Sequence, residues 1–134
     1  MRAFALPVAL LLLTLPAKAV ELMQPAAVNT AIEAGKIALV DIRTPAEWAE
    51  TGVAAPATPI DMTSPQFIEG LKKVIAENPG KQIALICRTG NRSSKMADAL
   101  EKAGLQNVID VAGGMAGKGG NRGWVAEGLP VKKL

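Results

Sequence analysis

The chain has 134 residues, of which 15 are basic and 12 acidic, with one cysteine and no histidine. The missing histidine excludes Cys–His proteases and Ser–His–Asp hydrolases, and a lone cysteine leaves no ligand set for a typical zinc site. Tyrosine is also absent and no basic tract alternates with aromatic residues, so no nucleic-acid partner is expected.

The first 19 residues are typical of a secretory signal peptide. Arg2 supplies positive charge, residues 3–15 form an apolar run, and residues 17–19 (Ala-Lys-Ala) match a cleavage site between small residues. The run is shorter than the ~20 residues of a membrane span, which argues against an uncleaved anchor. Cleavage after Ala19 predicts a periplasmic or secreted protein with no stable membrane insertion.

The remaining residues, 20–134, fit one domain with a core of its own. Losing Arg2 and Lys18 leaves 13 basic residues against 12 acidic ones, so the mature net charge is about +1. An exported protein meets an oxidising environment, yet one cysteine cannot form an internal disulfide. The single thiol therefore needs a chemical explanation.

The first half of the mature chain alternates apolar runs with amphipathic segments. Leu22-Met23 would begin an edge strand, and residues 25–34 form a helix that stops at Gly35. Residues 37–40 are apolar throughout, as in a buried parallel strand. Thr44, Pro45 and Glu47 make a capping box that starts a short helix.

The second half repeats this alternation. Ser64-Pro65 starts a helix that ends at residues 78–80, and residues 83–86 form a second buried strand. A helix over 93–103 and a strand over 108–111 complete the pattern. We therefore predict an α/β domain with a mainly parallel central sheet and helices on both faces.

Cys87 directly follows the strand at 83–86, and this is the most informative position in the chain. It opens a six-residue loop, Cys87-Arg88-Thr89-Gly90-Asn91-Arg92. A tight curl of this loop points successive N–H groups at the sulfur, and the next helix adds its own free N–H groups. Gly90 suits the positive φ of such a curl, and Asn91 tolerates it. Arg88 and Arg92 can hold the oxygens of an anion by charge-assisted hydrogen bonds.

Other interpretations of these residues are less specific. Cys87 could be a small buried residue with solvated arginines around it. Cysteine phosphatases also use a thiolate in an anion-binding loop, but they place five residues between cysteine and arginine, whereas only four separate Cys87 from Arg92. Asp41 and Arg43 are expected to form a structural ion pair, and Trp48 and Trp124 to be core aromatic residues.

Several segments together resemble a rhodanese domain, and the loop from Cys87 to Arg92 resembles the active-site loop of its sulfurtransferase branch. The matching segments are residues 39–48 (LVDIRTPAEW), 113–115 (GGM), 123–124 (GW) and 128–131 (GLPV). Two segments depart from the family pattern, residues 51–57 and the glycine-rich insertion at 116–123, which we expect to form a flexible flap near the site.

The resemblance implies a rhodanese-like sulfurtransferase, which the signal peptide would export, and we expect no metal or other cofactor. Cys87 would take a sulfane sulfur from a small anionic donor, such as thiosulfate or a persulfide, and pass it to a thiol or protein acceptor. Residues 88–92 would bind the donor, with Asp41 and Arg43 as structural support. Two alternatives stay open: a sulfur-carrier or partner-binding module without turnover, and a phosphatase or arsenate-reductase type of enzyme.

Overall fold

Five short strands pair in parallel within residues 19–134, the part of the chain that the computed structural model describes. In sheet order they are β1 (Glu21–Met23), β6 (Ile109–Val111), β5 (Gln82–Ile86), β2 (Ile37–Asp41) and β4 (Thr58–Pro59). A separate antiparallel pair joins β3 (Val53–Ala54) to β7 (Val131–Lys132). The prediction of a mainly parallel central sheet is confirmed.

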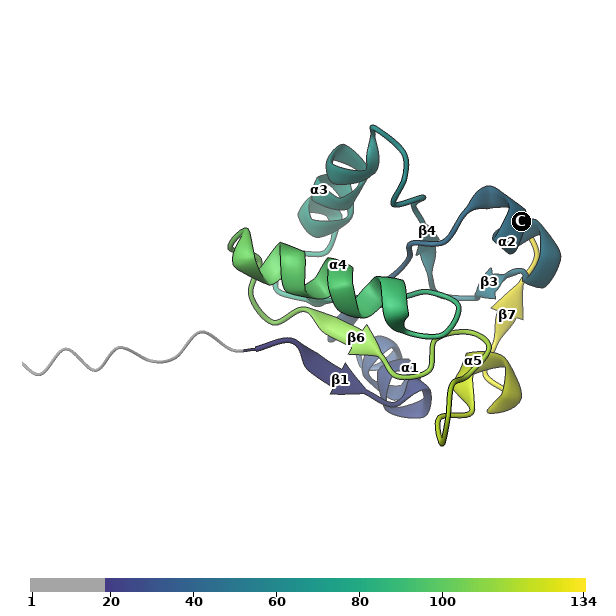
Figure 1. Ribbon diagram of the computed structural model, residues 1–134. Coiled ribbons are helices and arrows are strands. Elements are labelled where there is room, and N and C mark those ends of the chain that lie inside the picture. Colours follow the sequence, from purple (N-terminus) through teal and green to yellow (C-terminus); the bar gives the residue numbers. More distant parts are fainter. Residues whose placement is uncertain (1–18) are drawn as a thin grey trace, which may run out of the picture.

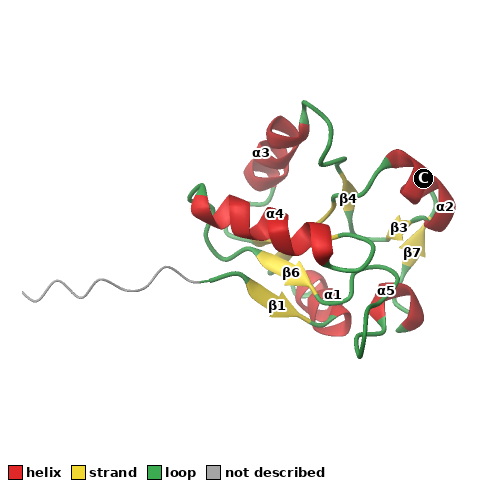
Figure 2. Ribbon diagram, viewed as in Figure 1, coloured by secondary structure: helices red, strands yellow, loops and turns green. Residues whose placement is uncertain are grey.

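Helices cover both faces of the sheet, because the strands between them are apolar on both sides. The helices are α1 (Pro25–Glu33), α2 (Pro45–Thr51), α3 (Phe67–Glu77), α4 (Asn91–Lys102) and α5 (Gly123–Ala126). Figure 1 shows α3 and α4 on one side of the sheet and α1 and α5 on the other. Figure 2, coloured by secondary structure, shows that loops join these elements at the two ends of the strands.

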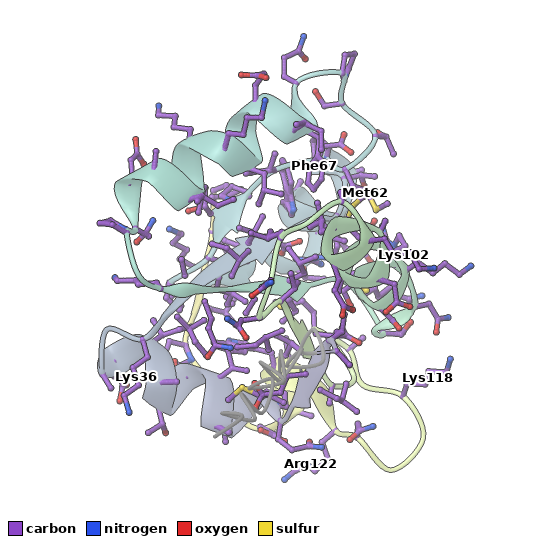
Figure 3. All side chains as sticks on the ribbon, turned by 90° about the vertical axis from the view of Figure 1, so that its left-hand side faces the viewer. Lys36, Met62, Phe67, Lys102, Lys118 and Arg122 are labelled. Atoms are coloured by element: carbon purple, nitrogen blue, oxygen red, sulfur yellow. The ribbon has the colours of Figure 1, made fainter. Side chains whose placement is uncertain are left out.

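Each face of the sheet has its own core. Val28 of α1 and Trp124 of α5 pack on one face, and Phe67 of α3 and Leu100 of α4 pack on the other. Phe67 lies on the inner side of its helix in Figure 3. Cys87 belongs to the second core, so its thiol lies on the α3 and α4 side of the sheet.

Some boundaries differ from the sequence-based expectations. Helix α3 begins at Phe67 because Ser64 is used in a turn, where its hydroxyl accepts from the N–H of Gln66 at 3.1 Å. Helix α4 begins at Asn91, two residues before the expected Ser93. Residues 1–18 of the expected signal peptide lie outside the described residues. None of the described helices is long and apolar enough to cross a membrane.

Candidate functional site

The expected site residues come together where three parallel strands end. Asp41 is the last residue of β2, Cys87 follows β5 directly, and Gly113 and Gly114 follow β6 after one intervening residue. These three strands are neighbours in the sheet, so their carboxyl ends share one edge. This edge is where open α/β sheets bind ligands.

Two backbone N–H groups point at the sulfur of Cys87. Gly90 donates to the Sγ atom at 3.1 Å and Ser93 donates at 3.4 Å, the latter from the first turn of α4. Gly90 adopts φ 101°, which an L-amino acid rarely takes, and this turns the chain from the loop into the helix. A cradle of N–H groups at a helix start favours negative charge on the sulfur.

The four remaining loop residues differ in their surroundings. Arg88 is exposed, Thr89 is half-buried, and the exposed Asn91 accepts a hydrogen bond from the Lys118 ammonium at 2.7 Å. Arg92 does not close over the sulfur with a free guanidinium. Its two terminal nitrogens donate to the two carboxylate oxygens of Glu47, each at 2.7 Å.

The Arg92 and Glu47 pair joins the loop to α2, and sequence reasoning missed it. The Arg92 hydrogen bonds lower the pKa of Glu47 from 4.5 to about 2, against an opposing effect of burial. The pKa of Arg92 is raised, first by Glu47 and to a smaller extent by the nearby Cys87 sulfur and Asp41. Glu47 also accepts from Thr44, as the expected capping box requires, so one carboxylate starts the helix and anchors the loop.

Ser93 and Asp110 are two further polar residues that sequence reasoning missed. The Ser93 hydroxyl lies 3.3 Å from the Cys87 sulfur and donates to the Oδ1 atom of Asp110 at 2.5 Å. Both side chains are buried. The sequence contained a weak signal, because Asp110 places a charged residue in the middle of an otherwise apolar strand.

Asp41 and Arg43 form the expected structural ion pair. The Arg43 side chain donates to both Asp41 oxygens, with a shortest distance of 2.7 Å, and both residues are almost completely buried. Arg43 also donates to the Gly52 carbonyl, and the Trp48 indole N–H donates to Asp41 at 3.2 Å. Trp48 is only partly buried, so its prediction as a core residue is wrong, whereas Trp124 is fully buried as expected.

The backbone after β6 supports the loop from below. The N–H of Met115 donates to the Cys87 carbonyl at 2.9 Å, and the N–H of Ala116 donates to the Arg88 carbonyl at 2.8 Å. Gly114 lies so close to both carbonyls that a Cβ there would come within 2.8 Å of Arg88. These contacts therefore fix the position of the loop relative to the carboxyl ends of the strands.

The glycine-rich insertion forms a closed turn. Lys118 and Asn121 exchange two backbone hydrogen bonds of 2.9 and 3.0 Å around Gly119 and Gly120. The Lys118 side chain reaches the loop at Asn91. Figure 3 shows Lys118 and Arg122 on this projecting turn.

A pocket of about 480 Å³ lies beside the loop. Its lining combines an apolar surface from the post-β6 segment and α5 with charged side chains from α2 and the loop. The lining residues are Arg43, Glu47, Glu50, Thr51, Arg88, Met115, Ala116, Val125 and Ala126. Arg88 faces this pocket without a side-chain partner among the described residues, so the loop presents a cation to it.

Comparison with known proteins gives the family. The chain is 29% identical over 98 residues to the uncharacterized protein RP600 of Rickettsia prowazekii, covering 69% of this chain and 80% of that protein. A rhodanese-related protein from Thermoplasma volcanium shares 29% identity at a TM-score of 0.65, covering 85% of this chain and 99% of the other.

The fold is also that of the polysulfide-sulfur transferase homodimer from Wolinella succinogenes, with a TM-score of 0.60 and 21% identity over 86% of this chain and 80% of the other. The model of the rhodanese-like domain matches residues 24–121, which contain the loop from Cys87 to Arg92 and its partners Glu47 and Asp110. The chain therefore belongs to the rhodanese-like domain family.

Proposed function

We propose that this protein is a sulfurtransferase that carries a sulfane sulfur on Cys87 as a persulfide. The observation that carries the proposal is the pair of N–H groups of Gly90 and Ser93, at 3.1 and 3.4 Å from the sulfur. They stabilise a thiolate and, after transfer, the negative charge of a persulfide. A polysulfide-sulfur transferase from Wolinella succinogenes has the same fold.

The transfer proceeds in two displacements. The Cys87 thiolate attacks the sulfane sulfur of thiosulfate, the sulfur–sulfur bond of the donor breaks, and its electron pair leaves with sulfite. An acceptor thiolate then attacks the outer sulfur of the persulfide and releases Cys87 as a thiolate. The attack is made by the thiolate form of Cys87, so no proton is transferred in that step itself.

Burial of the Cys87 sulfur favours a donor whose reactive sulfur is terminal and sterically accessible. Cys87 is only 1% exposed, so the atom that meets it has to project from the rest of its molecule. The terminal sulfur of thiosulfate or of a persulfide has this shape. Arg88, which is exposed and faces the pocket, is placed to hold the oxygens of an anionic donor.

Two features argue against a phosphatase. The loop has four residues between Cys87 and Arg92, so it is one residue shorter than a phosphate cradle. Arg92, the arginine that would have to clasp the phosphate, is engaged by Glu47 through two hydrogen bonds. Freeing it would break a bidentate ion pair, and such pairs are among the stronger charge-assisted contacts.

The pocket beside the loop fits the acceptor. Its apolar side, formed by Met115, Val125 and Ala126, can receive the organic part of a thiol, and Glu50 and Arg88 offer charges of both signs. We propose a thiol acceptor, small or on a protein, that docks here and receives the sulfur from Cys87. We further propose that this occurs in the periplasm or outside the cell, on the basis of the expected signal peptide.

Mass spectrometry of the intact protein tests the proposal. After incubation with thiosulfate and removal of excess donor, Cys87 should carry one additional sulfur atom, and a thiol acceptor should remove it. Cys87→Ser should stay folded and gain no sulfur. Sulfur that is gained but never passed to any thiol would favour the sulfur-carrier alternative, and a protein that never gains sulfur would overturn the proposal.

The two arginines provide a second, matched comparison. Arg88→Ala should slow loading from thiosulfate about tenfold or more but affect an uncharged persulfide donor little, because a charged hydrogen bond contributes about 1.5–3 kcal/mol. Arg92→Ala should slow both donors alike, since Arg92 holds the loop to Glu47. Equal losses from both donors in Arg88→Ala would contradict the donor-binding role of Arg88.

A further inference from the structure

Asp110 is a buried carboxylate that the sulfur-transfer steps do not use. Three charged residues are buried among residues 19–134: Asp41, Arg43 and Asp110. Asp41 and Arg43 neutralise one another, but Asp110, which is 6% exposed, forms no ion pair with any described residue. A buried charge without a counter-charge is costly, so its presence beside the sulfur calls for a chemical reason.

A continuous chain of polar atoms joins this carboxylate to the sulfur. The Cys87 sulfur lies 3.3 Å from the Ser93 hydroxyl oxygen, which lies 2.5 Å from Asp110 Oδ1 and 3.2 Å from the Gly90 carbonyl. Ser93 has one hydroxyl hydrogen to donate. When it donates to Asp110, its oxygen can accept the thiol hydrogen of Cys87.

The groups around Asp110 favour its protonated form. Its in-register neighbours, Leu85 of β5 and Leu22 of β1, are apolar. Burial is the main cause that raises the pKa of Asp110 above its ordinary 3.8, and the negative charge of Asp98 on α4 adds to it, whereas the Ser93 hydrogen bond opposes the rise. The pKa of an ordinary aspartic acid lies far below the ~8.5 of a free thiol, so an ordinary aspartate is a poor acceptor for a thiol proton. The raised pKa of Asp110 reduces this difference between the two pKa values.

We propose that Asp110 accepts the thiol proton of Cys87 through the hydroxyl of Ser93, an inference that rests on the sulfurtransferase function proposed above. The S–H bond of Cys87 breaks as its hydrogen passes to the Ser93 oxygen. The hydroxyl hydrogen of Ser93 passes to Asp110 Oδ1, where a carboxylic acid forms. No proton enters or leaves the site, and the buried negative charge moves from Asp110 to the sulfur.

This shift prepares the sulfur for both transfer steps. Ser93 can now donate its hydroxyl to the sulfur, which adds a third donor to the two N–H groups of Gly90 and Ser93. Near pH 7, where solvent base is scarce, solvent is a poor alternative acceptor because Cys87 is 1% exposed. Asp110 keeps the proton during the persulfide stage and returns it when the acceptor has displaced Cys87 as a thiolate.

Thiolate absorbance in the ultraviolet tests the proton position at equilibrium. The chain has one cysteine and no tyrosine, so Cys87→Ser provides a clean blank. In the wild type we expect the thiolate absorbance to rise in two steps as pH increases. In the first step Cys87 and Asp110 together lose one proton, and in the second, at higher pH, they lose the other. Asp110→Asn should show one step only.

Asp98→Asn is the matched charge control, because the charge of Asp98 acts on Asp110 and Asp98 is not one of the hydrogen-bond partners of the Ser93 hydroxyl. It should keep both steps. If Asp98→Asn shows the same single step as Asp110→Asn, the loss of the second step comes from removing any nearby negative charge, and the proposal is overturned. Identical absorbance profiles in the wild type and in Asp110→Asn would also overturn the proposal. A single step in the wild type that moves to lower pH in Asp110→Asn would overturn it as well, because Asp110 would then stay ionised while Cys87 loses its proton.

Single-turnover loading from thiosulfate tests the path of the proton. Near pH 7 we expect Asp110→Asn and Ser93→Ala to load about 10²-fold more slowly than the wild type, a loss typical of a removed proton acceptor. The rate should recover as pH rises and solvent base replaces Asp110, and Ser93→Thr, which keeps a hydroxyl, should restore most of it. A slow rate that is independent of pH would indicate a structural role and overturn the proposal.

The two proposals fail in different ways. If the wild type never gains sulfur but its thiolate titrates in two Asp110-dependent steps, the sulfurtransferase function fails and the proton acceptor stands. If the wild type loads sulfur and Asp110→Asn loads it equally fast with the same absorbance profile, the sulfurtransferase function stands and the proton acceptor fails.

Discussion

Arg88 and Arg92 lie in one loop but have different roles, because among the described residues only Arg92 has an acidic partner. Arg92 is 36% exposed and donates twice to Glu47, which is 21% exposed. Arg88 is exposed and faces the pocket, and no acidic side chain among residues 19–134 pairs with it. The guanidinium of Arg92 is therefore engaged in an ion pair with α2, whereas the guanidinium of Arg88 is available to bind a ligand.

The ion pair of Arg92 and Glu47 makes stability depend on pH in a defined range. Because the pKa of Glu47 is about 2 when folded and 4.5 ordinarily, its contribution is complete above about pH 4.5 and is lost as pH falls toward 2. Glu47→Gln should therefore lower the free energy of unfolding by about 1 kcal/mol near pH 7 and by almost nothing near pH 2. Urea unfolding at several pH values measures this difference.

Glu69→Gln is a suitable control for that experiment. Glu69 pairs with Lys72 at 3.4 Å, but both side chains are largely exposed, so its loss should change stability little at any pH. Glutamine can still accept the capping hydrogen bonds at position 47, so α2 should remain formed. A stability loss in Glu47→Gln that stays constant down to pH 2 would show that packing, not charge, is lost.

At the scale of residues, local order was easier to predict than distant pairing. Cys87 and Gly90 could be placed because their roles follow from neighbours within three positions. Glu47 and Arg92 are 45 positions apart, and Ser93 and Asp110 are 17 apart. Their pairing depends on how α2, α4 and β6 pack together, which hydrophobic periodicity does not specify.

Among the elements, the segment after β6 sets the position of the active loop. It carries Gly113 and Gly114, and the N–H of Met115 that follows donates to the Cys87 carbonyl. Gly114 itself accepts from the N–H of Trp124, whose side chain is fully buried in the core. The loop is thus connected to the α1 and α5 face of the sheet through a backbone that admits no side chain at Gly114.

Replacing Gly114 should disturb stability and chemistry together. Gly114 and Gly119 both adopt φ 58°, but a Cβ meets the Arg88 backbone at 2.8 Å in the first and nothing within 4 Å in the second. Gly119→Ala should cost about 1–2 kcal/mol of strain, and Gly114→Ala about 3 kcal/mol or more because overlap is added. Urea unfolding measures the costs, and thiosulfate loading should be slowed only in Gly114→Ala. Equal losses of unfolding free energy in the two variants would mean that the loop can move away from a Cβ at position 114 at no cost.

The longer elements were predictable and the shortest were not. The strands β2 and β5 were found as continuous apolar runs, and α2 was found through its capping box. The two-residue strands β3, β4 and β7 are too short to show any periodicity. The four-residue helix α5 begins at Gly123, the last residue of the expected flap, and its Trp124 packs into the core.

For the whole molecule, a lone thiol is compatible with an oxidising compartment because the fold shields it. Cys87 is 1% exposed, so a second thiol on another protein has little access to form a mixed disulfide. A small donor with a projecting sulfur has better access. Burial thus provides the explanation that a single cysteine would require in an exported protein.

The domain also begins close to the proposed cleavage site. The N–H of Glu21 donates to the Val108 carbonyl at 3.0 Å, and Val20 packs against the core on the α3 and α4 face. Cleavage after Ala19 would leave Val20 as the first residue and would remove none of these contacts. A mature protein that starts at Val20 therefore keeps the whole edge strand β1.

Sequencing of the amino terminus tests export directly. Protein recovered from the exported fraction should begin at Val20, with a mass that lacks residues 1–19. Ala19→Leu should slow this cleavage, since signal peptidases require a small residue there, and Thr30→Ser, on a helix far from the cleavage site in sequence, should not. A product that stays in the cytoplasm and retains Met1 would contradict export, and Cys87 would then be a thiol in a reducing compartment with no need of shielding.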